Sequence, residues 1–172
     1  MITVGILTIS DAVSKGQRQD ISGANIQRIV AKIGGQTIKR DVVPDERELI
    51  AGKLAEWADG GQLELVITTG GTGLSPRDVT PEATLQVLER VVPGLPEAMR
   101  ARTGEKNIHA MLSRGVAGIR ARCLIINLPG NPAGVEESLE AVLPAIPHAI
   151  DIMKGLTPSH TPPEHHRHEH HS

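Results

Sequence analysis

The sequence predicts an α/β fold: a three-layer sandwich in which a mostly parallel sheet carries helices on both faces. Two observations predict it. Short apolar, β-branched runs alternate along the chain with longer segments whose apolar residues recur at helical spacing. Hydrophobic residues make up 39% of the 172 residues, which is enough for a packed core. That core must be aliphatic, because the chain has one tryptophan and no phenylalanine or tyrosine.

The first half of the chain predicts strands over residues 3–10, 37–43 and 63–69, with a polar loop over residues 11–19. A helix is expected to open at Ser22-Gly23 and to end at Gly34-Gly35. The next helix follows Pro44-Asp45 and stops near residues 60–61. Glu48 lies three residues after Asp45, which is the spacing of a capping box. The apolar face of this helix is expected to comprise Leu49, Ile50, Leu54 and Trp57.

The second half predicts three more helices and one strand. The run Thr80-Pro81-Glu82 predicts a helix start with Thr80 as the N-cap, and this helix is expected to reach about residue 90. A helix over residues 96–104 and a buried strand over residues 122–128 follow. Residues 105–120 give no clear assignment. A long final helix carries Val135, Leu139, Val142, Leu143 and Ile146, and Pro144 and Pro147 should kink or interrupt it.

The chain divides into one predicted domain, residues 1–156, and a tail, residues 157–172, that we expect to be disordered. Six of the eight histidines lie in this tail. A histidine-rich tract can bind zinc or nickel loosely, and it can also belong to a purification tag.

Composition excludes several classes of function. The formal net charge is -2, with no basic stripe and almost no aromatic residues, so we expect no nucleic-acid partner. No apolar stretch approaches the roughly 20 residues that cross a bilayer, so we expect no membrane association. The first ten residues resemble a core strand rather than a signal peptide. The lone cysteine, Cys123, is expected to be a buried strand thiol, and a cytoplasmic location fits a chain without an internal disulfide.

Polar and glycine-rich loops follow the predicted strands at Ser10-Asp11, at Asp45, at residues 70–78 and at residues 129–132. Carboxyl ends of parallel strands share one edge of a sheet, so these loops should converge there. The run Gly70-Gly71-Thr72-Gly73 suits an anion or a heterocycle, because glycines accept positive φ and expose main-chain N–H groups. It lacks the Gly-Lys-Ser/Thr of a Walker loop and the spacing of a dinucleotide motif. A tight turn that merely needs glycine remains the alternative.

Two carboxylates could serve this site. Asp78 is not needed as a helix cap, although it could instead form a surface ion pair with Arg77. Asp45 could cap the helix that follows it, and this role does not exclude catalysis. Two carboxylates facing one phosphate site could hold Mg²⁺.

The 129–132 turn leads into a helix and suits either a phosphate or a rigid connection. Ser10-Asp11 suits either a ribose or base contact or a simple turn.

Together these stretches resemble a known family. The run TTGGTGLSPRDVTPEAT over residues 68–84 is similar to the signature of the molybdenum cofactor biosynthesis domain. The resemblance is strongest to the molybdopterin adenylyltransferases, the bacterial MogA and MoaB proteins and the corresponding domains of plants and of gephyrin. The runs ISD at residues 9–11, DISG at 20–23, VPDE at 43–46 and LIINLPGNP at 124–132 agree with it in the same order.

The resemblance implies an enzyme that joins molybdopterin to AMP, uses ATP and Mg²⁺, and releases pyrophosphate. The product would pass to a downstream metal-insertion protein. It also implies a homotrimer, with a hexamer as the alternative that some members adopt. Asp45 and Asp78 match the acidic residues of catalysis and would hold the metal. The positions that match substrate-binding residues are Ser10, Asp11, Gly70, Gly71, Thr72, Gly73, Ser75, Asn127, Pro129, Gly130, Asn131 and Pro132.

One departure concerns the turn after residue 132, where Ala133-Gly134 replaces the hydroxyl or basic residue of some relatives. Side-chain help for a phosphate is therefore reduced there. The main alternative function is a non-catalytic molybdopterin-binding protein of the same family. A scaffold role and the related domain of nicotinamide-nucleotide recycling proteins fit the pattern less well.

Overall fold

The structure of the chain is a computed structural model that describes residues 1–156. The tail over residues 157–172, with its predicted disorder and metal affinity, lies outside the described residues. Six strands form one sheet in the order β2-β1-β3-β6-β5-β4. Their bounds are β1 (Ile2–Ile9), β2 (Gly35–Val43), β3 (Leu65–Thr69), β4 (Arg90–Val91), β5 (Ala117–Arg120) and β6 (Cys123–Leu128).

The sheet confirms the predicted class. The pairs β1–β2, β1–β3 and β3–β6 are parallel, whereas β5 runs antiparallel to β6 and β4 antiparallel to β5. The sequence does not predict the antiparallel edge. Strand β5 lies in the stretch without an assignment, and β4 lies where the preceding helix was expected to end. Both strands are short, so they carry little of the period-two signal from which strands are recognised.

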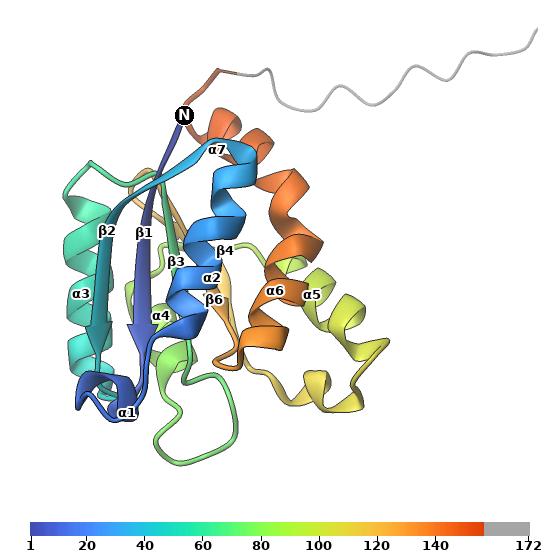
Figure 1. Cartoon of the computed structure of the whole chain (residues 1–172). Coiled ribbons are helices and arrows are strands. Elements are labelled where there is room, and N and C mark those ends of the chain that lie inside the picture. Colours follow the sequence, from blue (N-terminus) through green and yellow to red (C-terminus); the bar gives the residue numbers. More distant parts are fainter. Residues whose placement is uncertain (157–172) are drawn as a thin grey trace, which may run out of the picture.

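Helices cover both faces of the sheet (Figure 1). One face carries α2 (Ile21–Val30), α5 (Gly94–Gly104), α6 (Pro132–Val142) and α7 (Ile146–Met153), and the other carries α3 (Arg47–Asp59) and α4 (Thr80–Val87). Short turns complete the set: α1 (Asp11–Ser14), η1 (Ala31–Ile33), η2 (Ile108–Leu112) and η3 (Leu143–Ala145). None of the helices within residues 1–156 is long and apolar enough to cross a membrane.

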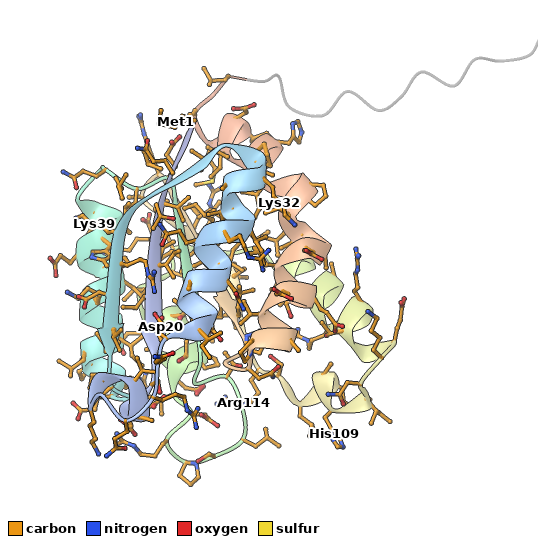
Figure 2. All side chains as sticks on the ribbon, viewed as in Figure 1. Met1, Asp20, Lys32, Lys39, His109 and Arg114 are labelled. Carbon is orange, nitrogen blue, oxygen red and sulfur yellow. The ribbon has the colours of Figure 1, made fainter. Side chains whose placement is uncertain are left out.

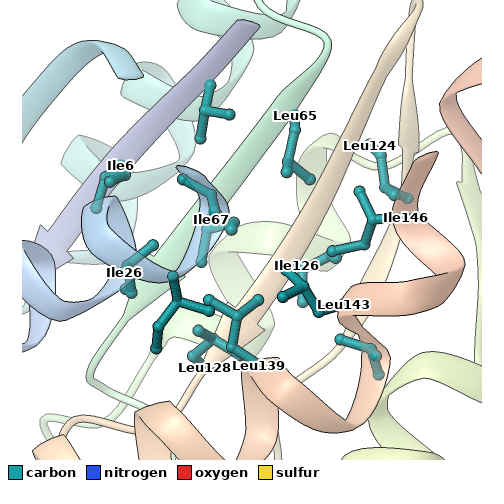
Figure 3. Packing of buried hydrophobic residues seen from close by; sticks show 14 of the residues in the cluster. Ile6, Ile26, Leu65, Ile67, Leu124, Ile126, Leu128, Leu139, Leu143 and Ile146 are labelled. Carbon is teal, nitrogen blue, oxygen red and sulfur yellow. The ribbon is translucent and has the colours of Figure 1, made fainter. Parts of the chain in front are cut away.

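The core consists of aliphatic side chains on both sides of the sheet. In β1, Val4 and Ile6 contribute to the cluster under α2, α6 and α7, while Leu7 and Ile9 contribute to the cluster under α3 and α4. Figure 3 shows the first of these clusters. Every residue of β3 and β6 is buried, so these strands form a rigid base beneath the loops at their carboxyl ends.

Most helix boundaries agree with the sequence. Gly34 ends the first helical segment in a left-handed conformation (φ 76°), as the glycine pair predicts. The last helix is interrupted by η3, which contains Pro144, and α7 resumes at Ile146. The expected apolar face of α3 is wrong at Leu49, which is 48% exposed, whereas Ile50 is buried.

Two predicted caps and one predicted loop are wrong. Glu46, not Asp45, precedes the first residue of α3 and makes no side-chain cap bond. Val79 occupies the N-cap position of α4, and Thr80 is the first helical residue. The Asp45 carboxylate and the Thr80 hydroxyl instead bond to other loops. Residues 11–14 form α1 because the Ser10 hydroxyl accepts the N–H of Val13 and caps that turn.

Candidate active site

The predicted convergence of loops is present. Strands β1, β2, β3 and β6 run parallel, and the loops that follow them meet at one edge of the sheet, at the lower end in Figure 1. A cavity of about 550 Å³ lies among these loops. We call it the strand-end pocket; the predicted residues that line it are Ser10, Asp45, Gly70, Gly71, Asp78, Gly130, Asn131 and Pro132.

The two N-terminal loops are held together by carboxylates. The N–H of Asp11 donates to Oδ2 of Asp45 at 2.9 Å, and the N–H of Asp45 donates to Oδ1 of Asp11 at 3.0 Å. Arg77 then pairs with both carboxylate oxygens of Asp11, with Nε–Oδ2 at 3.1 Å and Nη2–Oδ1 at 2.9 Å. This pairing and the Asp45 N–H lower the pKa of Asp11. The sequence suggested Asp78 as the ion-pair partner of Arg77, but in the structure the partner of Arg77 is Asp11.

The surroundings of the Asp45 carboxyl disfavour its ionised form and raise its pKa. Burial is the largest cause, and the negative charges of Asp11 and Asp78 raise the pKa further. The hydrogen bond from the Asp11 N–H and the positive charge of Arg77 lower it, but they do not cancel the rise. A carboxylate that is partly buried beside like charges favours a bound cation. Raised pKa values of this origin are common at functional sites.

Residues 70–79, which we call the glycine loop, depend on glycine at two positions. Gly70 and Gly71 have φ of 101° and 68°, in the left-handed region. A Cβ at Gly71 would overlap the Thr80 hydroxyl and lie 3.1 Å from Oδ1 of Asp45. The Thr80 hydroxyl donates to the carbonyl of Gly70 at 2.9 Å. The loop is thereby pressed against the start of α4 and the carboxylate of Asp45.

Four consecutive amides of this loop are available to a ligand. The N–H of Gly70 donates to the carbonyl of Leu128, and the N–H of Ser75 donates to Oδ2 of Asp78 at 3.0 Å. Between them, the N–H groups of residues 71–74 have no acceptor within the described part of the chain. Successive unpaired N–H groups form an anion-binding concavity.

Asn127, a predicted substrate-binding residue, lines neither the strand-end pocket nor the cavity beside the glycine loop, and its side chain is engaged within the fold. Its side-chain N–H groups donate to the hydroxyls of Thr68 and Thr84, each at 3.0 Å, and its Oδ1 accepts the N–H of Val116. Because the amide is 1% exposed and fully engaged, it links β6, β3 and α4 under the glycine loop.

The 129–132 turn is held rigidly at the start of α6. Oδ1 of Asn131 accepts the N–H of Gly134 at 2.7 Å and caps the helix, and Pro132 is its first residue. The carbonyl of Gly130 accepts the Ser22 hydroxyl at 2.8 Å. The turn thus presents mainly backbone to the pocket.

A second cavity, of about 500 Å³, lies beside the glycine loop and adjoins the strand-end pocket. We call it the loop-side pocket; it is lined by Thr72, Gly73, Leu74, His109, Leu112, Ser113 and Pro129. It shares Gly71, Asp78, Gly130 and Asn131 with the strand-end pocket. Two ligands bound in the two pockets could therefore meet at Asp78.

Several residues at these pockets had no predicted role. Arg18, Asp20 and Ser22 line the strand-end pocket, while His109 and Ser113 line the loop-side pocket (Figure 2 labels Asp20 and His109). His109 and Ser113 lie in the stretch that had no periodic pattern, so no neighbouring element placed them. Asp20 follows no strand, and the signals that could have pointed to it are its position before a helix and its place in the DISG run over residues 20–23.

The described residues contain no cluster of three or more histidine, cysteine or acidic side chains suited to a metal. Asp45 and Asp78 nevertheless both line the strand-end pocket. Each has one carboxylate oxygen engaged by a backbone N–H, which leaves Oδ1 of both without a hydrogen bond among residues 1–156. Two such oxygens fit Mg²⁺, which commonly binds one or two carboxylates together with substrate phosphates and water.

Comparison with known proteins agrees with this geometry. The model of the family described as a probable molybdopterin binding domain matches residues 5–148. The chain belongs to this family. A molybdopterin adenylyltransferase of Helicobacter pylori (strain J99) is 45% identical over 156 residues, which are 90% of this chain and 89% of that protein. The molybdopterin adenylyltransferase of Escherichia coli (strain K12) is 36% identical, over 90% of this chain and 86% of that protein.

Among solved structures, the molybdopterin biosynthesis enzyme MoaB of Thermus thermophilus matches with a TM-score of 0.86. It is 51% identical, and the match covers 90% of this chain and 98% of the other. The family likeness thus extends over the sheet, the glycine loop and both pockets.

Proposed function

We propose that this chain is a molybdopterin adenylyltransferase of molybdenum cofactor biosynthesis. It transfers AMP from ATP to the terminal phosphate of molybdopterin and releases pyrophosphate. Family membership and the relatives of that name support this assignment. The observation that carries it is the arrangement around Asp78, which lines both pockets: Asp45 lines the strand-end pocket, and the loop with four unpaired amides, residues 71–74, lines the loop-side pocket.

We assign the nucleotide to the strand-end pocket and the pterin to the loop-side pocket. The strand-end pocket has the polar surroundings that a sugar and a triphosphate need: Ser10 and Arg18, together with the backbone turn at Gly130. The loop-side pocket is bordered by Leu74 and Leu112, whose apolar surface suits a flat heterocycle. With this assignment, the pterin phosphate and the α-phosphorus of ATP meet beside Gly71 and Asp78.

We propose that Asp45 and Asp78 hold Mg²⁺ through their free carboxylate oxygens. When bound there, the ion offsets the negative charge that builds up on the reacting phosphates. Asp45 is positioned by the N–H of Asp11, and Asp78 is positioned by the N–H of Ser75. Both carboxylates thus reach the pocket with one oxygen fixed and one oxygen available.

The chemistry requires alignment more than proton transfer. A phosphate oxygen of molybdopterin is already anionic at neutral pH, so it attacks the α-phosphorus without a strong base. The new bond joins that oxygen to the α-phosphorus, and the bond from the α-phosphorus to the bridging oxygen breaks, with its electron pair leaving on pyrophosphate. The N–H groups of residues 71–74 orient the phosphates and offset their charge. Asn127 and the rigid 129–132 turn support this loop from below.

The experiment is pyrophosphate release from ATP and Mg²⁺, measured with and without molybdopterin. Release that depends on the pterin, and that Asp78→Asn loses by about 100-fold, supports the proposal. Asparagine keeps an acceptor for the Ser75 N–H, so the loop should persist. Asp59→Asn is the matched control, because Asp59 pairs with Arg120 away from both pockets. Pterin binding without pyrophosphate release would indicate a non-catalytic binding protein.

We further propose a cytoplasmic homotrimer that delivers its product to a metal-insertion protein; a hexamer is the alternative assembly. The resemblance to the family supports the assembly and the downstream partner. Exposed apolar side chains at Leu74, Ile108 and Met111 offer surface that an assembly could bury. The free, buried thiol of Cys123 suits a reducing compartment. Light scattering on the purified chain gives the number of copies directly.

A further inference from the structure

Arg114, in the link between η2 and β5, contacts both arms of the glycine loop (Figure 2). Its backbone N–H donates to the carbonyl of Thr72 at 2.8 Å, and its Nε donates to the carbonyl of Gly73 at 2.8 Å. Its Nη2 reaches across to the carbonyl of Asp78, also at 2.8 Å. One residue therefore holds the beginning and the end of the segment that carries the free amides and Asp78.

The same guanidinium is anchored to α4. It forms a two-point ion pair with Glu82, with Nη1–Oε2 at 2.8 Å and Nη2–Oε1 at 3.0 Å. The hydrogen bonds from Arg114, together with its charge, lower the pKa of Glu82, so this carboxylate is ionised at neutral pH. The planar guanidinium presents several N–H groups in a fixed geometry, and lysine cannot reproduce that geometry. The glycine loop is thus tied to a helix that packs on the sheet.

These bonds determine where the loop amides point. In a trans peptide the C=O and the N–H point in opposite directions. Because the carbonyls of Thr72 and Gly73 face Arg114, the N–H groups of Gly73 and Leu74 face away from it. These are two of the amides without an acceptor in residues 1–156. Arg114 itself is not among the residues that line the two pockets.

We propose that Arg114 is the positioning residue of the transfer reaction: with Glu82, it clamps the glycine loop so that the loop amides and Asp78 meet the pterin phosphate. This inference rests on the proposed function. Arg114 acts through the loop and does not touch the reacting atoms. Its effect should therefore appear in the KM for molybdopterin and in kcat, and not in the KM for ATP.

The chain offers a matched control. Arg120 also forms a two-point ion pair, with Asp59 (Nε–Oδ1 at 3.0 Å and Nη2–Oδ2 at 2.9 Å), and also donates to a backbone carbonyl, that of Val87, at 2.9 Å. It contacts neither pocket. Arg114→Met and Arg120→Met thus each remove a two-point ion pair together with side-chain bonds to backbone carbonyls, two such bonds at the glycine loop for Arg114 and one elsewhere for Arg120.

We expect Arg114→Met to raise the KM for molybdopterin about tenfold and to lower kcat about tenfold, with the KM for ATP unchanged within about twofold. Arg120→Met should leave all three values near those of the wild type. Arg114→Lys keeps the charge without the planar fork, so it should retain most of the defect. Full recovery in Arg114→Lys would show that charge alone matters and would overturn the proposal.

Hydrogen exchange at the bonded amides of Ser75, Asp78 and Thr80, measured by mass spectrometry without ligands, gives a readout independent of activity. We expect exchange to be about tenfold faster in Arg114→Met and Arg114→Lys and unchanged in Arg120→Met. If the wild type releases no pyrophosphate with molybdopterin, the proposed function is refuted. In that case hydrogen exchange still tests the clamp, because an unchanged exchange rate in Arg114→Met would refute it. If the wild type is active, wild-type kinetics in Arg114→Met overturn the proposal whatever the exchange rates are.

Discussion

Asp11 and Asp45 each accept a hydrogen bond from the other's backbone N–H, at 2.9 and 3.0 Å. The two residues are 34 positions apart in the chain, and the exchange joins the loop after β1 to the loop after β2. Arg77 of the glycine loop binds the same Asp11 carboxylate. Three loops are therefore connected through Asp11, and the free oxygen of Asp45 is oriented by this connection.

Replacing Asp11 by alanine should lower kcat about tenfold through misplacement of Asp45 and Arg77. The N–H of Asp45 and the guanidinium of Arg77 both lose their acceptor. Asp11→Asn retains one acceptor oxygen and should give an intermediate rate. Steady-state pyrophosphate release measures the effect, and Asp59→Ala, which frees Arg120 far from the pockets, is the control. Equal rates in Asp11→Ala and wild type would remove this connection from the mechanism.

Asp45→Asn should make the protein more stable at neutral pH while it abolishes turnover. Burial and the charges of Asp11 and Asp78 raise the pKa of Asp45, with Arg77 as the opposing charge. Ionised Asp45 therefore destabilises the folded chain above that raised pKa. Asparagine removes the charge and keeps an acceptor for the Asp11 N–H. We expect an increase in Tm of about 2 °C at neutral pH, from roughly 1 kcal/mol or less in a partly exposed group.

The gain in Tm should depend on pH in a defined direction. Below the unfolded-state pKa of an aspartate, near 4, Asp45 is protonated in both states and the advantage of asparagine vanishes. The gain should appear as pH rises through the raised pKa of the folded state. Thermal unfolding followed by the fluorescence of Trp57, which is 4% exposed, measures it. A variant less stable than wild type at neutral pH would contradict the raised pKa.

Gly71→Ala should destabilise the chain and inactivate the site. The residue has φ of 68°, and a Cβ there would collide with the Thr80 hydroxyl and approach Asp45. Gly34→Ala separates the two effects, because Gly34 has φ of 76° and a Cβ there would meet nothing within 4 Å. We expect about 1 kcal/mol of strain for Gly34→Ala and about 3 kcal/mol for Gly71→Ala, where overpacking adds to strain.

Urea unfolding gives both free energies, and pyrophosphate release shows which variant keeps its activity. Gly34→Ala should retain wild-type turnover, since Gly34 lies at the opposite end of the sheet from the site, before the start of β2. Similar losses of stability in the two variants would mean that the glycine loop can move away from Thr80 and Asp45.

The parallel part of the fold was predictable because its signals are local. The buried apolar runs at β1, β3 and β6 and the helical spacing in α2 and α6 each appear within about ten residues. The sequence could also place Asp45, Asp78 and the glycine loop at one edge, because parallel strands share their carboxyl ends. These predictions needed no knowledge of side-chain contacts.

What the sequence could not supply are partners chosen by tertiary contact. Asp45 has capping-box spacing to Glu48, yet its carboxylate bonds to Asp11, 34 residues away. Thr80 precedes a proline as an N-cap would, yet its hydroxyl bonds to Gly70. Arg114 has no pattern around it, and only the folded loop shows what it binds. A side chain with local capping propensity forms a tertiary hydrogen bond instead where a buried polar group needs a partner.

Cys123 should be inert in the folded protein, which would exclude thiol chemistry from the mechanism. The thiol is buried under α3 and α4, and desolvation raises its pKa to about 12. Thiol reagents attack the thiolate, so at pH 8 the native chain should react with iodoacetamide far more slowly than the chain in urea.

Cys123→Ala should keep the wild-type rate of pyrophosphate release and lose about 1 kcal/mol of stability from the small cavity. Rapid labelling of the native chain, or loss of turnover in a Cys123→Ala variant that unfolds cooperatively, would contradict a purely structural thiol. The measurement is the rate of labelling as a function of urea concentration, compared with unfolding followed by Trp57 fluorescence. A purely structural thiol should be labelled only at the urea concentrations at which the chain unfolds.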